Sequence, residues 1–116
     1  MTKRIALVAF DGEPMCFVHV LLNALDMHDR GYDVKLIIEG SATRAANLLN
    51  DPSAQFARFY AGVKEKQLID CVCRACAAKM GALPGIEDQG LPLCGEMTGH
   101  PSLARYIDQG YQIITF

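Results

Sequence analysis

Short apolar runs alternate with helical patterns along the whole chain, and this alternation is the feature that most limits the possible folds. Residues 5–10 form an unbroken apolar run, which is typical of a strand buried on both faces. Further strands are expected at residues 34–38, 68–73, 91–94 and 112–116, and helices at 15–30, 45–49, 54–66, 75–80, within 83–90 and at 102–109. Parallel strands need such crossover helices. The sequence therefore predicts an α/β fold, a three-layer α/β/α sandwich around a mostly parallel five-stranded sheet, as a single domain over residues 1–116.

The charge balance excludes several classes of partner. Eleven basic and thirteen acidic residues give a formal charge of −2, which provides no basic footprint for nucleic acid or an anionic membrane. No apolar run reaches the roughly eighteen residues that a membrane span needs. The first apolar run ends at Asp11 and Gly12 without a small-residue cleavage site. We therefore expect a cytoplasmic protein that binds neither nucleic acid directly nor a membrane.

The cysteines are the unusual part of the composition. There are five, an odd number: Cys16, Cys71, Cys73, Cys76 and Cys94. Secreted proteins with disulfide scaffolds normally have an even number of cysteines. In a reducing compartment, clustered thiols are more often catalytic or metal-binding than part of structural disulfides. Ligands of open parallel sheets bind at the carboxyl ends of the strands, and four of these cysteines fall at such ends. The sequence therefore places the functional site at that edge of the sheet.

Cys73 has the position that best suits reactive chemistry. It is expected between the third strand and the amino end of a helix, where free backbone N–H groups and the helix dipole favour an anion. Such a position, with Arg74 nearby, is expected to lower the pKa of the Cys73 thiol and to make it reactive. Cys76 follows one helical turn later, so the two sulfurs are expected close together. No glycine-rich phosphate-binding motif is present, and no cofactor is expected.

Other uses of the cysteines stay open. Cys71, Cys73, Cys76 and Cys94 offer four thiolates for a zinc ion, although only Cys73 and Cys76 have the usual two-residue spacing. The cysteine motif of thioredoxin-like thiol–disulfide exchange also lies at the start of a helix that follows a strand. Here the cysteine pair follows the third strand, which fits a thioredoxin topology poorly. Cys16 and Cys71 are also consistent with small buried side chains.

The remaining polar candidates are expected to be structural. His19 belongs to the polar stripe of the first helix, and His28 lies near the end of that helix. His100 precedes a helix on the same side of the sheet and could reach the thiols, but the simpler expectation is a loop histidine. Three glutamates near strand ends are expected to be solvated or capping groups: Glu13, Glu39 and Glu96.

With Cys73 at the strand–helix junction, the chain resembles the DsrE/DsrF-like family of small cytosolic proteins. The resemblance covers nearly the whole length and is most specific at residues 72–81, VCRACAAKMG, with support from the opening strand and helix, residues 38–40 and residues 110–116. It implies the three-layer fold and assembly into homo- or hetero-oligomers, often trimers or hexamers. Several members resembling this chain carry sulfane sulfur as a cysteine persulfide towards tRNA thiolation or sulfur oxidation. Cys73 matches the sulfur-carrying cysteine and Cys76 matches a second cysteine of some members, whereas Cys71 and Cys94 depart from the simplest pattern.

These observations together predict a sulfur carrier or sulfurtransferase-like protein that accepts sulfane sulfur on Cys73, with Cys76 as a resolving or supporting thiol. Its sulfur donor or acceptor is expected to be another protein. One alternative is an oligomeric binding module whose cysteines are structural or bind zinc, and another is a thiol–disulfide oxidoreductase using Cys73 and Cys76. A homo-oligomer, for example a trimer or hexamer, is expected because the apolar arc of residues 17–22 is wider than one small sheet covers.

Overall fold

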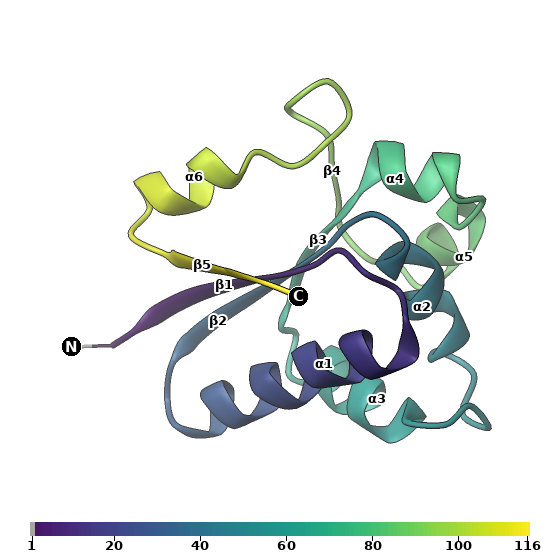
Figure 1. The fold of residues 1–116 in the computed structure, drawn as a ribbon, viewed down its shortest axis with the longest axis horizontal. Helices are drawn as coiled ribbons and strands as arrows, with labels where there is room; N and C mark the ends of the chain where they lie inside the picture. The colour runs from purple at the N-terminus through teal and green to yellow at the C-terminus, as the bar shows by residue number, and fades with distance from the viewer. Residues whose placement is uncertain (1) are drawn as a thin grey trace.

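Five apolar runs form strands, and all five lie parallel in one sheet (Figure 1). The computed structural model describes residues 2–116. The strands are β1 (Arg4–Ala9), β2 (Asp33–Ile38), β3 (Ile69–Cys73), β4 (Leu93–Cys94) and β5 (Gln112–Thr115), in the spatial order β4-β3-β2-β1-β5. The α/β prediction is confirmed, and the sheet is wholly rather than mostly parallel.

The helices connect consecutive strands, as parallel pairing requires. They are α1 (Pro14–Asp29), α2 (Ala42–Leu48), α3 (Ala57–Glu65), α4 (Arg74–Lys79), α5 (Leu83–Asp88) and α6 (Leu103–Asp108). The helix expected from residue 54 begins only at Ala57, because Phe56 has a left-handed backbone with φ of 70°. The strand expected from residue 91 is reduced to Leu93 and Cys94. Among residues 2–116, no helix is both long and apolar enough to cross a membrane.

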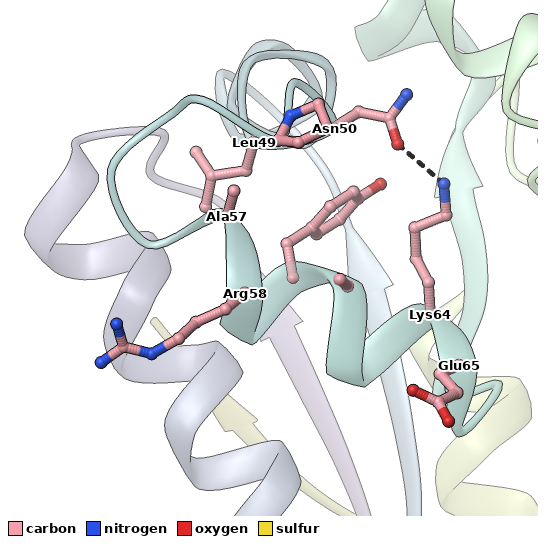
Figure 2. Close-up of a pocket in the computed structure, with 9 residues that line it drawn as sticks. Leu49, Asn50, Ala57, Arg58, Lys64 and Glu65 are labelled. Atoms are coloured by element: carbon pink, nitrogen blue, oxygen red, sulfur yellow. Dashed lines mark hydrogen bonds between the residues drawn. The ribbon is translucent and has the colours of Figure 1, made fainter.

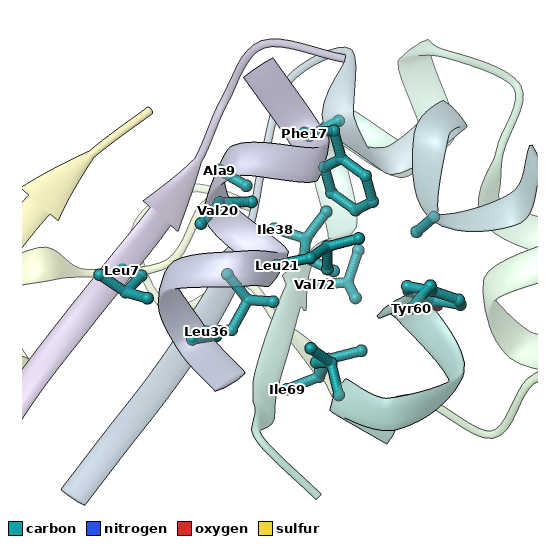
Figure 3. Close-up of a cluster of buried hydrophobic side chains, with 14 of the residues drawn as sticks. Leu7, Ala9, Phe17, Val20, Leu21, Leu36, Ile38, Tyr60, Ile69 and Val72 are labelled. Atoms are coloured by element: carbon teal, nitrogen blue, oxygen red, sulfur yellow. The ribbon is translucent and has the colours of Figure 1, made fainter. Parts of the chain in front are cut away.

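The sheet separates two cores of unequal size. On one face, Leu7, Leu36 and Val72 pack against side chains of α1 and α3, including Phe17 and Tyr60 (Figure 3). The other face carries a smaller core beneath α6, formed by seven buried residues: Ala6, Val8, Ile37, Cys71, Cys94, Tyr106 and Tyr111. Complete burial of a large aliphatic or aromatic side chain stabilises a fold by about 1.5–3 kcal/mol, so the larger core dominates the stability.

The apolar arc of α1 does not form an open surface. Phe17, Val18, Val20 and Leu21 are all buried within the chain, and only Leu22 is exposed, at 42%. The sheet and α3 cover the arc that the sequence suggested was too wide for one chain. The argument for self-association from residues 17–22 is therefore wrong, and any interface must use other residues.

Candidate functional site

Four side chains with donor atoms for proton transfer or metal binding meet at the carboxyl edge of the sheet. They are Glu39, Cys73, Cys76 and His100, and one donor atom from each lies within 4.8 Å of the other three. The strand register explains part of this meeting, because Ile38 of β2 pairs with Val72 of β3. The next residues along both strands, Glu39 and Cys73, are consequently neighbours.

Cys73 lies at the junction that the sequence predicted. It ends β3 and is the N-cap of α4, and its Sγ accepts a hydrogen bond from the backbone N–H of Cys76 at 3.3 Å. The Cys73 Sγ also lies 3.2 Å from Nδ1 of His100, while the Cys76 Sγ lies 3.7 Å from the same nitrogen. The two cysteines are unbonded thiols that share one imidazole.

The predicted ionisation of Cys73 is wrong. The residue has no exposed surface, and this burial raises the pKa of its thiol to about 12. The neighbouring Cys76 side chain raises it further, whereas the Cys76 backbone N–H acts in the opposite direction. Removal from water outweighs the single N–H bond, and Arg74 is exposed to solvent. At neutral pH Cys73 is therefore a thiol, and its reaction as a nucleophile requires a base.

A tight loop holds His100 against the thiols. The backbone groups of Met97 and His100 bond to each other at 2.8 and 3.0 Å, which closes the loop. The Gly99 carbonyl accepts a bond from Ala75 N–H of α4 at 2.9 Å, and a Cβ on Gly99 would lie 3.0 Å from the Ala75 Cβ. Gly99, at φ of 92°, thus permits close contact between the loop and α4. A loop histidine without function was the simpler expectation from sequence, because nothing local shows this contact.

Glu39 was also expected to be a solvated or capping group, and the structure places it among the thiols instead. Its carboxyl group is half-buried, and burial raises its pKa, while the charge of His100 acts in the opposite direction. The backbone N–H of Glu39 donates to the Ala9 carbonyl at 2.8 Å, which fixes the position of the residue at the end of β2. The only sequence signal was its place directly after a buried strand.

Cys71 and Cys94 do not join the site. They form a disulfide with a Cα–Cα distance of 5.7 Å, buried in the core beneath α6. The four-thiolate zinc site considered from sequence is therefore not formed, because two of its sulfurs are bonded to each other. The sequence left the role of these two cysteines open, and the disulfide makes them structural.

The other sequence candidates have the structural roles expected of them, except Cys16. The Glu13 carboxylate caps α1 by accepting from the Cys16 N–H at 3.1 Å, and Glu96 accepts from the Ser102 N–H at 2.7 Å. His19 and His28 are exposed on α1. Cys16 is partly exposed rather than buried, and it lies outside the thiol cluster.

A separate hollow of about 650 Å³ lies between the end of α2 and α3. Leu49, Ala57 and Tyr60 form much of its wall, and the Lys64 ammonium points towards the Asn50 amide oxygen, 2.9 Å away (Figure 2). Lys64 also donates to Gln89, so its charge is already engaged. The thiol cluster lies elsewhere, at the opposite end of α2, and is the better candidate for chemistry.

Comparison with known proteins gives one clear relationship. No family model matches the sequence. MJ0733, an uncharacterized protein of Methanocaldococcus jannaschii, is 34% identical over 97 residues, which cover 84% of this chain and 77% of MJ0733. The chain belongs to the MJ0733 family. Two uncharacterized proteins of Archaeoglobus fulgidus match shorter stretches, one with 44% identity over 43 residues and the other with 43% over 37 residues, covering 37% and 32% of the chain and 70% and 100% of those proteins.

A solved structure supports the fold of this MJ0733 family member. The protein of unknown function BT1422 from Bacteroides thetaiotaomicron superposes with a TM-score of 0.68 at 17% identity, covering 96% of this chain and 94% of BT1422. At that identity the likeness concerns the fold alone. The function of the MJ0733 family member must therefore be argued from its own site.

Proposed function

We propose that this protein is a DsrE/DsrF-like sulfur carrier in which Cys73 accepts a sulfane sulfur and holds it as a persulfide. The observation that carries the proposal is the 3.2 Å distance between the Cys73 Sγ and His100 Nδ1. A thiol and an imidazole within hydrogen-bond distance are the usual pair for a cysteine nucleophile and its base. The resemblance of residues 72–81 to the sulfur-relay family supports the same chemistry.

The first step transfers one sulfur atom without net oxidation. His100 Nδ1 takes the Sγ–H proton while the Cys73 sulfur attacks the terminal sulfur of a donor persulfide, R–S–SH. The S–S bond of the donor breaks, and the leaving thiolate takes the proton back from the imidazole. The products are Cys73–S–SH and R–SH. Because burial raises the pKa of Cys73, this step depends on His100 as the base.

Access to Cys73 requires a local movement. Cys73 has no exposed surface, whereas Glu39, Cys76 and His100 are each partly exposed. A donor therefore approaches from the side of these three residues, and the exposed residues 95–98 must move aside while the imidazole stays beside Cys73. Residues 95–98 are all exposed, which leaves room for that movement, whereas Pro101 on the other side of His100 is buried.

Cys76 supplies a second step. Its thiol can attack the inner sulfur of the Cys73 persulfide, forming a Cys73–Cys76 disulfide and releasing H₂S; a low-molecular-weight thiol then reduces the disulfide. When an acceptor thiol attacks the outer sulfur instead, the sulfur is passed on and Cys73 returns to its thiol form. Cys76 thus decides between release and relay of the sulfur.

The test is sulfur loading followed by intact mass. The reduced protein is incubated with glutathione persulfide, and we expect the added mass of one sulfur, mapped to Cys73. Cys73→Ser abolishes the addition, His100→Ala slows it by about a hundredfold, and the matched control Cys16→Ser loads like the unmodified chain. If the Cys73→Ser variant takes up as much sulfur as the unmodified chain, the proposal is wrong.

Thiol–disulfide exchange is a second candidate, and one observation favours it. The Cys73 and Cys76 sulfurs are both free and lie within 4.8 Å of each other. An oxidoreductase forms a reversible Cys73–Cys76 disulfide with a defined reduction potential and retains no sulfur from a persulfide donor. The same mass measurement therefore separates the two candidates.

We further infer that the carrier works in the cytoplasm, exchanges sulfur with partner proteins and assembles as a homo-oligomer. The edge strand β5 supports self-association, because Gln112, Ile114 and Thr115 are exposed along it. A formal charge of −2 and the absence of a basic footprint in the sequence favour protein partners over nucleic acid.

A further inference from the structure

We propose that Glu39, Cys73, Cys76 and His100 form a site for one divalent cation of borderline or soft character, with Zn²⁺ as the representative ion. The ligands come from four separate places in the fold: the end of β2, the end of β3, the first turn of α4 and the loop between β4 and α6. The sequence pointed to a different set, in which Cys71 and Cys94 took the places of Glu39 and His100.

The distances fit a tetrahedral ion. Zinc binds sulfur at about 2.3 Å and nitrogen or oxygen at about 2.0–2.2 Å, so the ligand atoms around it are roughly 3.4–3.8 Å apart. The Cys73 Sγ and Cys76 Sγ lie 3.2 and 3.7 Å from His100 Nδ1, and all four donor atoms lie within 4.8 Å of one another. Small side-chain rotations suffice to bring the set around one ion.

The kinds of ligand select the cation. Two sulfurs, one imidazole nitrogen and one carboxylate oxygen suit Zn²⁺ and related transition metals, whereas Mg²⁺ and Ca²⁺ prefer sites made entirely of oxygen. With Cys73 and Cys76 as thiolates and Glu39 as a carboxylate, the ligands carry three negative charges against the two positive charges of the ion. Binding releases the two thiol protons to solvent.

The surrounding backbone holds the ligands as metal sites require. The Cys76 N–H already donates to the Cys73 Sγ at 3.3 Å, and the Gly99 carbonyl ties the His100 loop to α4 through Ala75. Such contacts around the ligands orient them and are worth tenfold to a hundredfold in metal affinity. Glu39 is fixed in turn through its own N–H bond to Ala9.

Metal binding is tested directly on the full chain, reduced and freed of metal. Co²⁺ serves as the first probe, and we expect one Co²⁺ per chain with a thiolate-to-metal absorption band and the intense visible bands of tetrahedral cobalt. Zn²⁺ then displaces it, and competition with a chromogenic chelator gives the Zn²⁺ affinity. Cys73→Ser and Cys76→Ser, as single variants, are each expected to lower the intensity of the thiolate band by at least about half.

The two ligands that sequence reasoning missed give the sharper test. Glu39→Gln and His100→Ala are each expected to weaken Zn²⁺ binding at least about tenfold, while Cys16→Ser and His19→Ala leave it unchanged. Circular dichroism of each variant shows whether it folds. If a Cys73 variant does not fold, Glu39→Gln, at a partly exposed position, still tests the site. An affinity unaffected by Glu39→Gln or by His100→Ala overturns the four-ligand site, as does the absence of stoichiometric binding.

One consequence rests on the proposed function: an ion bound to the Cys73 sulfur should block sulfur loading. Zn²⁺-loaded protein is expected to take up no sulfur from glutathione persulfide, and removal of the ion should restore loading. The two proposals fail separately. A chain that binds Zn²⁺ yet takes no sulfur when metal-free keeps the metal site and loses the carrier function, and a chain that loads sulfur without binding Zn²⁺ does the reverse.

Discussion

At the scale of single residues, Cys73 is subject to two opposing effects. The Cys76 backbone N–H favours the thiolate, while complete burial favours the neutral thiol and raises the pKa of Cys73 to about 12. Burial dominates because a single hydrogen bond does not replace the lost hydration of the anion. The proposed sulfur transfer therefore needs the imidazole of His100 as the base for Cys73.

This balance predicts the order in which the free thiols react. With a pulse of iodoacetamide on the native protein at neutral pH, partly exposed Cys16 is expected to be labelled before Cys73, because Cys73 is both shielded and protonated. Labelling of Cys73 should accelerate as the pH rises towards its pKa. Peptide mapping by mass spectrometry measures each site, and preferential labelling of Cys73 at neutral pH would show an open, ionised thiol instead.

Gly99 provides a second prediction at this scale. Gly99→Ala places a Cβ 3.0 Å from that of Ala75 and forces φ of 92° on an L-residue, so a loss of about 1–3 kcal/mol in unfolding free energy is expected. His100 should also move away from the thiols. Urea unfolding measures the loss, with Gly90→Ala as the control, since Gly90 has φ of 70° but open space around a Cβ. Equal losses in the two variants would mean that the contact with α4 is unimportant.

At the scale of elements, the loop between β4 and α6 is anchored by Glu96. Its carboxylate accepts from the Ser102 N–H and pairs with Arg105 at 3.4 Å. The backbone N–H bond is the main cause that lowers the pKa of Glu96 below its ordinary value of 4.5. A site residue, His100, thus depends on a carboxylate four positions earlier in the same loop.

The lowered pKa predicts a pH-dependent contribution of this anchor. A carboxyl group with a lower pKa in the folded state stabilises the fold above its unfolded pKa, and the stabilisation is lost as the pH falls through the folded value. Glu96→Gln should therefore destabilise the protein at pH 7 and have no effect once the pH is well below the folded pKa. Thermal unfolding from acid to neutral pH measures this, with the exposed Glu65→Gln as control. A pH-independent effect would contradict the role of the Glu96 charge.

The disulfide joins β3 to β4, two neighbouring strands with only two paired positions. A covalent link across 23 residues stabilises a fold by about 3 kcal/mol. The double variant Cys71→Ala, Cys94→Ala is expected to lose about that much unfolding free energy relative to the oxidised chain. The control variant Cys16→Ala is expected to keep the unfolding free energy of the unmodified chain. Thiol titration in denaturant should find three free thiols before reduction and five after it. Five free thiols before reduction would rule out the bond.

At the scale of the whole molecule, the site lies at the ends of β2 and β3 and beside β4, away from the outer strand β5. Figure 1 shows β5 and α6 at the opposite side of the molecule from α4 and α5. The exposed β5 edge is consequently free for contact between copies without covering the thiols. An assembly built through β5 would leave every site open to donors.

Self-association through this edge is testable. Light scattering after size exclusion is expected to give a mass above the 12.7 kDa of one chain. Ile114→Lys on β5, where Ile114 is 39% exposed, should shift the protein towards the monomer, whereas Ile107→Lys on α6 should not. A chain that is monomeric at every concentration would contradict the expected homo-oligomer.

Much of the architecture was predictable because it depends on local patterns. Apolar runs such as residues 5–10 and the turn residues after them predicted five strands and their crossover helices, and the place of Cys73 before α4 followed from the same pattern. The size of β4 and the late start of α3 were not predictable, because they depend on pairing with β3 and on the left-handed backbone at Phe56.

The sequence by itself determined the sheet, the order of its helices and the spacing of Cys73 and Cys76, since each of these depends on residues close together in the chain. Only the tertiary structure decided that Glu39 and His100 join them and that Cys71 and Cys94 bond to each other beneath α6. It also decided the protonation of Cys73. The physical reason is that contacts between distant residues and removal from water depend on how strands and loops pack, which no local pattern of residues specifies.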